Sequence, residues 1–298
     1  MSIPFVRTFD FEYGQAAQLS PLVQRVMADN PGPFTYTGTG VFIIGDASVC
    51  VIDPGPTTGD HVAALDRALA GRSVSHILVT HHHADHSPLA KPLAAKHGCK
   101  VYGFSLPPAA AEDGTVQLEA GHDLTFKPDV EIRDGHIITG DGWTLEAIHT
   151  PGHTSNHLCF ALHEENTLFS GDHIMGWSTS VVVSPDGHMG DYLKSLNTVL
   201  DRNFDIIRPT HGPAITEVRP FVQAYIDHRL AREAQIMGAL ETGLETISDI
   251  VAQLYKDVDK RLHPAAAHSV LSQMIHLRET GRVGADGPDS LAQRYRLA

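Results

Sequence analysis

Cysteine is scarce in this sequence, and its scarcity argues against a disulfide-stabilised secreted domain. Three cysteines, Cys50, Cys99 and Cys159, lie far apart in the 298 residues and form no CxxC pair. An odd, dispersed set of cysteines is typical of reduced thiols in a cytoplasm-like compartment. We therefore predict free thiols and a cytoplasmic location.

Cationic residues and long apolar runs are also few. The 22 Lys and Arg residues against 35 Asp and Glu residues give a formal net charge of −13, which disfavours RNA or anionic lipid as the main partner. No apolar run approaches the roughly 20 residues that span a bilayer. The first residues lack the basic and apolar regions of a signal peptide. The sequence therefore predicts no membrane partner.

Histidine, by contrast, is abundant: the chain has 20 histidines, and the motif HHHADH covers residues 81–86. The motif follows an apolar strand predicted over 74–80. Side chains at i and i+2 of an extended segment share a face, so His81 and His83 can converge on one point. The chain then turns, which lets Asp85 and His86 face a second point nearby. Imidazole and carboxylate ligands favour zinc, with iron or manganese as alternatives.

Three further polar residues stand at the ends of predicted strands, beside glycine or proline. They are His153 in TPGHT, Asp172 in SGDH and His211 in PTHGP. A single histidine or aspartate next to a glycine turn means little. Three of them after the HHHADH motif indicate one shared metal site.

In this order the motifs resemble those of the metallo-β-lactamase superfamily, which run HxHxDH, then His, then Asp, then His, and the resemblance covers roughly residues 33–213. It implies a four-layer αββα sandwich with a dinuclear metal site at one edge of its two sheets. His82 falls on the variable position and is not a predicted ligand. Asp53 resembles the buried aspartate that supports the ligand loop, a role that metal-bound imidazoles commonly require. By this resemblance His81, His83 and His153 would hold one metal, Asp85, His86 and His211 the other, and Asp172 would bridge them.

Two positions at which this sequence differs from other branches of the superfamily restrict the activities that it predicts. Asp172 stands where the antibiotic-hydrolysing zinc enzymes carry cysteine, and His83 stands where flavodiiron proteins carry glutamate. Single-iron persulfide dioxygenases use fewer of these ligands, so the full set favours two metals and hydrolysis. The glyoxalase-type thioesterases and the RNA-processing members both remain compatible.

The tail of the chain changes character. Amphipathic helices are predicted over 219–241, 247–255 and 264–279, and a short ribbon over 281–298. These segments resemble the lactamase-beta-2-like group, whose members carry a small winged-helix-like domain at this end. We therefore predict an α/β catalytic domain over 1–216 and a helical, winged-helix-like domain over 217–298.

The remaining elements follow from hydrophobic periodicity and turn residues. Residues 1–32 show little periodicity, and short strands with many turn residues are predicted over 105–142. The predicted strands are 41–45, 48–53, 100–104, 144–150, 157–162, 167–172 and 205–211. The predicted helices are 60–70, 88–96 with Ser87 as its N-cap, and 190–202.

The leading functional hypothesis is a hydrolase in which a hydroxide bridging two divalent ions attacks an ester, thioester or related acyl bond of a small molecule. Asp172 and Asp85 are its predicted catalytic residues, because the first would fix the metal separation and the second would orient the nucleophile. One alternative keeps the site but makes single-stranded RNA the substrate. A second, from a different class, is a non-catalytic scaffold whose helical tail forms a homodimer.

Four residues near the ligands have weaker assignments. His173 and His188 are candidates for the general acid, while Trp177 and Tyr192 are candidates for the wall of the substrate pocket. For each of them an ordinary structural role is the competing interpretation. His157 is interpreted as a structural histidine.

Overall fold

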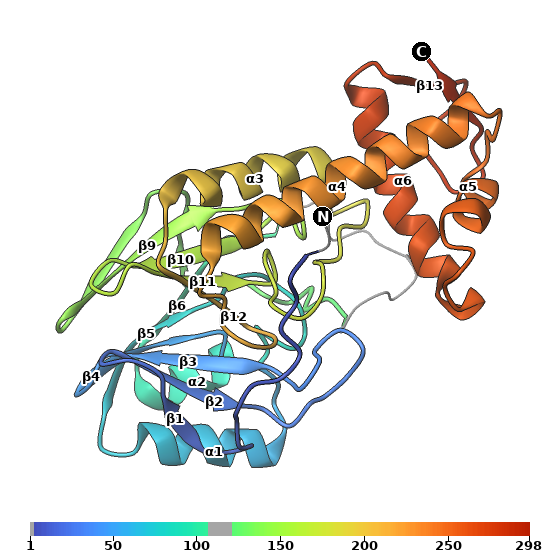
Figure 1. Ribbon diagram of the computed structural model, residues 1–298. Coiled ribbons are helices and arrows are strands. Elements are labelled where there is room, and N and C mark those ends of the chain that lie inside the picture. Colours follow the sequence, from blue (N-terminus) through green and yellow to red (C-terminus); the bar gives the residue numbers. More distant parts are fainter. Residues whose placement is uncertain (1–2, 107–120) are drawn as a thin grey trace.

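Two β-sheets stacked face to face form the centre of the larger, amino-terminal part of the chain (Figure 1). The computed structural model describes residues 3–106 and 121–298. The first sheet has seven strands in sequence order: β1 (Ala16–Gln18), β2 (Val23–Met27), β3 (Gly40–Ile44), β4 (Ser48–Ile52), β5 (Ser73–Leu78), β6 (Lys100–Gly103) and β7 (Val130–Glu131). The second has five, in the spatial order β12 (Ile206–Pro209), β11 (Thr167–Gly171), β10 (Leu158–Leu162), β9 (Trp143–His149) and β8 (Ile137–Gly140).

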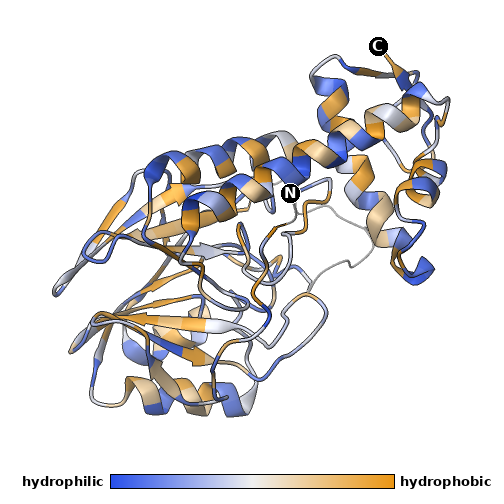
Figure 2. Ribbon diagram, viewed as in Figure 1, coloured by the Kyte–Doolittle hydropathy of each residue, from blue (hydrophilic) through white to orange (hydrophobic). Residues whose placement is uncertain are grey.

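Side chains alternate in direction along the central strands. They form three apolar layers: one between the two sheets and one on the outer face of each sheet. On β3, Phe42 and Ile44 face the opposite sheet, whereas Val41 and Ile43 face the helices outside. Successive side chains of a strand point to opposite faces, so a strand covered on both sides is apolar throughout. Figure 2 shows this apolar character along the strands of both sheets.

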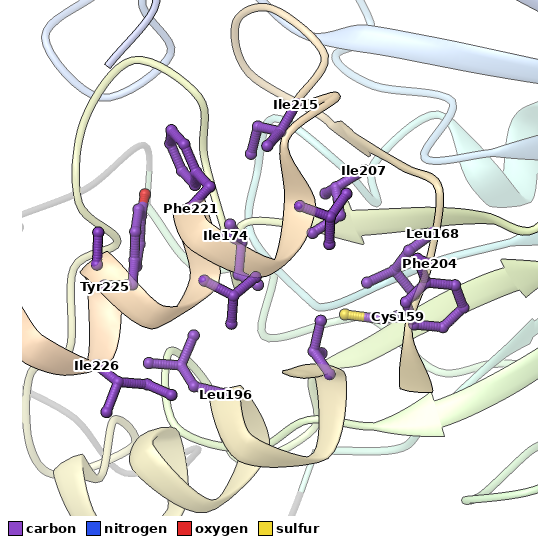
Figure 3. Packing of buried hydrophobic residues seen from close by; sticks show 14 of the residues in the cluster. Cys159, Leu168, Ile174, Leu196, Phe204, Ile207, Ile215, Phe221, Tyr225 and Ile226 are labelled. Atoms are coloured by element: carbon purple, nitrogen blue, oxygen red, sulfur yellow. The ribbon is translucent and has the colours of Figure 1, made fainter. Parts of the chain in front are cut away.

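Helices cover the outer face of each sheet, which gives the four layers that the resemblance implied. Helices α1 (Gly59–Leu69) and α2 (Ala90–His97) pack on the first sheet, and α3 (Met189–Arg202) and α4 (Val218–Glu241) pack on the second. Figure 3 shows the second of these interfaces, where Leu196 of α3 and Phe221 of α4 belong to one apolar cluster with Leu168 of β11. The predicted αββα sandwich is confirmed.

The carboxy-terminal domain has a core of its own. Helices α5 (Ile247–Leu254) and α6 (His263–Glu279), joined through the short 3-10 helix η2 (Lys260–Leu262), pack with a ribbon of β13 (Val283–Ala285) and β14 (Tyr295–Leu297). Helix α4 belongs to both cores, because its first half packs on the second sheet and its second half packs on α5 and α6. Within the described residues, no helix is long and apolar enough to cross a membrane.

Three sequence predictions differ from the observed elements. Strands β1 and β2 lie within residues 1–32, for which no element was predicted. Helix α2 begins at Ala90 and not at Pro88 after an N-cap at Ser87, because residues 87–89 form a turn that closes the ligand loop. The segment over 105–142 does contain the short strands β7 and β8, although its residues 107–120 lie outside the described residues.

Candidate metal centre

The ligand loop is held in place by one buried carboxylate. Asp53 follows β4 with a left-handed backbone (φ 48°) and is fully buried. Its carboxylate accepts hydrogen bonds from Thr80 N and Thr80 Oγ1, both at 2.7 Å, and lies 2.9 Å from His86 Nδ1. The start and the end of the HHHADH loop are therefore fixed to the same side chain.

Three histidines and one aspartate form the first cluster. His81 Nε2 lies 2.9 Å from His83 Nδ1, and His83 Nδ1 lies 3.2 Å from His153 Nε2. Asp172 completes the set, and its ligand atom and the three imidazole nitrogens lie within 4.8 Å of one another. All four residues are buried, so a cation placed among them would be screened from solvent.

Asp85, His86 and His211 form the second cluster. His211 Nε2 lies 3.0 Å from Asp85 Oδ2, and His86 Nε2 lies 3.5 Å from the same oxygen. Asp172 stands between the clusters, because its Oδ1 lies 3.5 Å from His211 Nε2 and its Oδ2 lies 3.8 Å from His153 Nε2. The structure thus brings together all seven residues that the resemblance singled out.

Acceptors behind three of the imidazoles fix their tautomers. His153 Nδ1 lies 2.7 Å from the Val181 carbonyl, and His211 Nδ1 lies 3.1 Å from the Gly38 carbonyl. His86 Nδ1 has Asp53 in the same role. In the neutral ring such a contact places the proton on Nδ1 and leaves Nε2 as the nitrogen that would bind a metal. The sequence analysis missed the two carbonyls, because a backbone oxygen leaves no side-chain signal.

The acids of the site remain ionised. Burial alone would raise the pKa of Asp85, but the neighbouring His86 and His211 outweigh it and lower the pKa to about 2. For Asp172 burial acts the same way, yet His211 and His86 hold its pKa well below the usual range. Burial lowers the pKa of His83 to about 4, which favours the neutral imidazole that a metal needs.

Buried polar atoms of the site that make no hydrogen bond test whether a metal fits. His86 Nε2 and Asp172 Oδ1 make no hydrogen bond within the described residues, although both are screened from water. Buried polar atoms are normally paired, and both atoms point at the clusters. Together with a donor set of five imidazoles and two carboxylates, they fit divalent cations.

His157 has a specific contact that its interpretation as a structural histidine did not include. Its Nε2 lies 3.2 Å from Asp172 N, from which it accepts a hydrogen bond, and its Nδ1 lies 2.9 Å from Thr150 Oγ1. Burial holds the pKa of His157 well below its usual value, so the ring is neutral. His157 therefore orients the backbone that carries Asp172.

A small pocket opens over the clusters. It has a volume of about 40 Å³, and Trp177 lines it while stacking on Tyr36 at a ring distance of 4.7 Å. At least 10–15 Å³ is needed for one water, so the pocket has room for a small reacting group. Its described lining is Pro33, Phe34, His83, Asp85, His153, Asp172, Met175, Trp177, Ser178, Thr179 and Val181.

Three of the weaker assignments lie outside this pocket lining. Tyr192 is fully buried and donates its hydroxyl to the His173 carbonyl, so it is a core residue. Burial lowers the pKa of His173 to about 3, and the ring is screened from the pocket. His188 instead contacts Glu279 of α6 at 2.8 Å. We exclude these three side chains from the site, while Trp177 belongs to it.

Comparison with known proteins identifies the class. The family model of the metallo-beta-lactamase superfamily matches residues 36–211, and the model of the beta-lactamase associated winged helix domain matches residues 246–289. The chain belongs to the metallo-β-lactamase superfamily and is a hydrolase of that fold with a winged helix domain at its carboxy-terminal end.

Individual relatives agree with this class. A beta-lactamase-like protein 2 homolog of Caenorhabditis elegans is 34% identical over 275 residues, which are 89% of this chain and 87% of the relative. An atrochrysone carboxyl ACP thioesterase of Cryptosporiopsis sp. is 28% identical over 285 residues, which are 89% of this chain and 82% of the relative. The solved structure of a beta-lactamase domain protein from Burkholderia ambifaria has a TM-score of 0.79 at 21% identity and covers 100% of this chain and 97% of its own.

Proposed function

We propose that the protein hydrolyses the acyl thioester of a small molecule at a site that holds two divalent metal ions. The observation that carries the proposal is the pair of ligand clusters joined by Asp172 at the base of an open pocket. The thioesterase named among the relatives supports the choice of a thioester over other acyl bonds. Hydrolysis adds water to the carbonyl carbon and breaks the carbon–sulfur bond, so the products are a carboxylic acid and a thiol.

The two ions, when bound, would lower the pKa of a shared water to about 7 and polarise the carbonyl oxygen. His81, His83 and His153 would hold one ion, and Asp85, His86 and His211 the other. The nitrogen and oxygen donors favour zinc for both positions.

The two aspartates have separate roles in this proposal. Asp172 Oδ1 lies 3.5 Å from His211 Nε2 of one cluster and its Oδ2 lies 3.8 Å from His153 Nε2 of the other, so this carboxylate would set the spacing between the ions. Asp85 lines the pocket and stays ionised because its pKa is lowered to about 2, so it can accept the hydrogen bond of the attacking water. We propose both as catalytic residues.

Metal content and thioester hydrolysis, measured on the same preparations, test the proposal. We expect close to two equivalents of zinc, iron or manganese per chain, and hydrolysis of an N-acetylcysteamine thioester that Asp172→Ala abolishes. Asp66→Asn is the matched control, because Asp66 pairs with Lys96 at the surface. Less than one equivalent of metal, or cleavage of single-stranded RNA with no thioester hydrolysis, would overturn it.

A further inference from the structure

A groove runs from the metal pocket to the carboxy-terminal domain. Its volume is about 390 Å³, within the 300–1,000 Å³ range of small-molecule sites. It adjoins the pocket over the ligand clusters, because five residues line both. The shared residues are Pro33, Phe34, Ser178, Thr179 and Val181.

The carboxy-terminal domain supplies an apolar second wall. Val258 and Leu262 line the groove and remain 38% and 57% exposed, and the exposed Ala265 follows on α6. Val182 and Val183 lie across from them on the loop after β11. Apolar side chains that gather in a hollow and stay exposed to water mark a site for an apolar ligand.

The described lining of the groove has little positive charge with which to bind an anion. Arg229 is the one charged side chain among its described lining residues, and it is 6% exposed. Its guanidinium donates to the Ser180 carbonyl and lies 5.1 Å from the centre of the Tyr192 ring. Arg229 of α4 therefore holds the loop after β11, the loop that lines the groove. Since nucleic acids are bound mainly through neutralised phosphates, this wall does not suit RNA.

Tyr255 gives the apolar wall a rigid edge. The Arg232 guanidinium lies 4.4 Å from the centre of the Tyr255 ring, which fixes the ring where it lines the groove. The aromatic edge adds apolar surface to the groove, which suits an alkyl chain better than a polar group.

We propose that this groove binds the apolar acyl chain of the substrate, and that Val258 and Leu262 select for chain length. The inference rests on the proposed thioesterase function, because the metal pocket would hold the thioester carbon while the chain extends along the groove. The carboxy-terminal domain then forms part of the substrate site.

Acyl N-acetylcysteamine thioesters of two, six and ten carbons test this on the full-length, metal-loaded protein. We expect kcat/KM to rise by up to about fourfold for each methylene that the groove buries. Leu262→Asp and Ala265→Trp should each lower the ratio of the decanoyl to the acetyl kcat/KM at least tenfold, since one places a charge in the groove and the other fills it. Leu291→Asp is the matched control, because Leu291 is 41% exposed and lies outside the described groove lining, and it should leave the ratio unchanged.

A binding measurement separates the two proposals. The decanoyl amide of N-acetylethylenediamine cannot be hydrolysed readily, and calorimetry should show it binding at least tenfold more tightly than the acetyl amide. Binding that depends on chain length without thioester hydrolysis would support the groove and overturn the proposed function. Hydrolysis with equal kcat/KM along the series, or unchanged ratios in both groove variants, would overturn the groove.

Discussion

Asp53 and His86, 33 residues apart in the chain, meet at 2.9 Å beneath the ligand clusters, where the carboxylate accepts a hydrogen bond from Nδ1 of the imidazole. The same carboxylate also accepts hydrogen bonds from Thr80 and, at 3.2 Å, from the Thr210 hydroxyl next to His211. The Asp53 carboxylate thus holds together chain segments that follow three different strands.

Asp53→Asn should weaken metal binding about 10–100-fold, the usual effect of losing such a supporting group. The asparagine amide has the shape of the aspartate carboxylate but lacks the negative charge that orients His86. Competition between the protein and a chelator for zinc measures the change, with Asp66→Asn as the control. Affinity equal to that of the unmodified protein would contradict this role of Asp53.

Gly152→Ala should destabilise the loop that carries His153. Gly152 has φ 140°, and an added Cβ would lie 2.4 Å from Tyr192 Cα, which is backbone and cannot swing aside. We expect this overlap to lower the free energy of unfolding by about 1–3 kcal/mol, in addition to the cost of the backbone strain. Metal binding should also become weaker. Denaturant unfolding measures the first effect.

Gly142→Ala is the matched control for that substitution. Gly142 also has a left-handed backbone (φ 77°), but nothing lies within 4 Å of the added Cβ. It should cost only the left-handed strain, about 1–2 kcal/mol. If the two variants lose equal stability and bind metal equally, the close approach to Tyr192 has no effect.

Thiol labelling should distinguish the three cysteines. Cys50 and Cys159 are fully buried, and burial raises the pKa of the Cys159 thiol to about 12, whereas Cys99 is partly exposed. We expect one thiol per native chain to react with a disulfide reagent at pH 8 and three after denaturation. Cys99→Ser should abolish the native reaction. Fast labelling of the Cys99→Ser variant would show that a core strand opens and exposes Cys50 or Cys159.

His228→Gln should make stability less sensitive to acid. Burial and the neighbouring Arg229 and Arg232 lower the pKa of His228 from 6.5 to about 4. The unfolded chain therefore binds this proton first as the pH falls, so His228 contributes stability above pH 6.5 that is lost between about pH 6.5 and 4. Midpoints of thermal unfolding at pH 7.5 and 5 should differ less in the variant. Equal differences would contradict this pKa.

Much of the fold was predictable because strong patterns coincide with buried elements. The HHHADH motif stands directly after an apolar strand, and the long helix over 218–241 has few competing turn signals. Strand β1 was not predictable, because a three-residue edge strand that stays partly exposed has too short a pattern. Helix α2 begins late because Ser87, an apparent N-cap, donates instead to Asp123.

The site was predictable in its side chains, the supporting Asp53 included, and not in its backbone supports. Seven ligand candidates carry recognisable residue types at strand ends, and the structure brings all of them together. The carbonyls of Gly38 and Val181 support two of those histidines, and only the folded backbone shows which residues supply them. The groove is formed by segments about 80 residues apart, Ser178–Val183 and Tyr255–Ser269, so no local pattern indicates it.

Helix α4 is a single rod of 24 residues, roughly 36 Å long, that serves two hydrophobic cores. A helix that melts at one end deprives the other core of its cover, so the two domains behave as one cooperative unit. Heating should accordingly give one transition in which metal and helical structure are lost together. A chain cut ahead of this rod would expose apolar side chains such as Leu196 and Ile207, and the isolated catalytic half would aggregate.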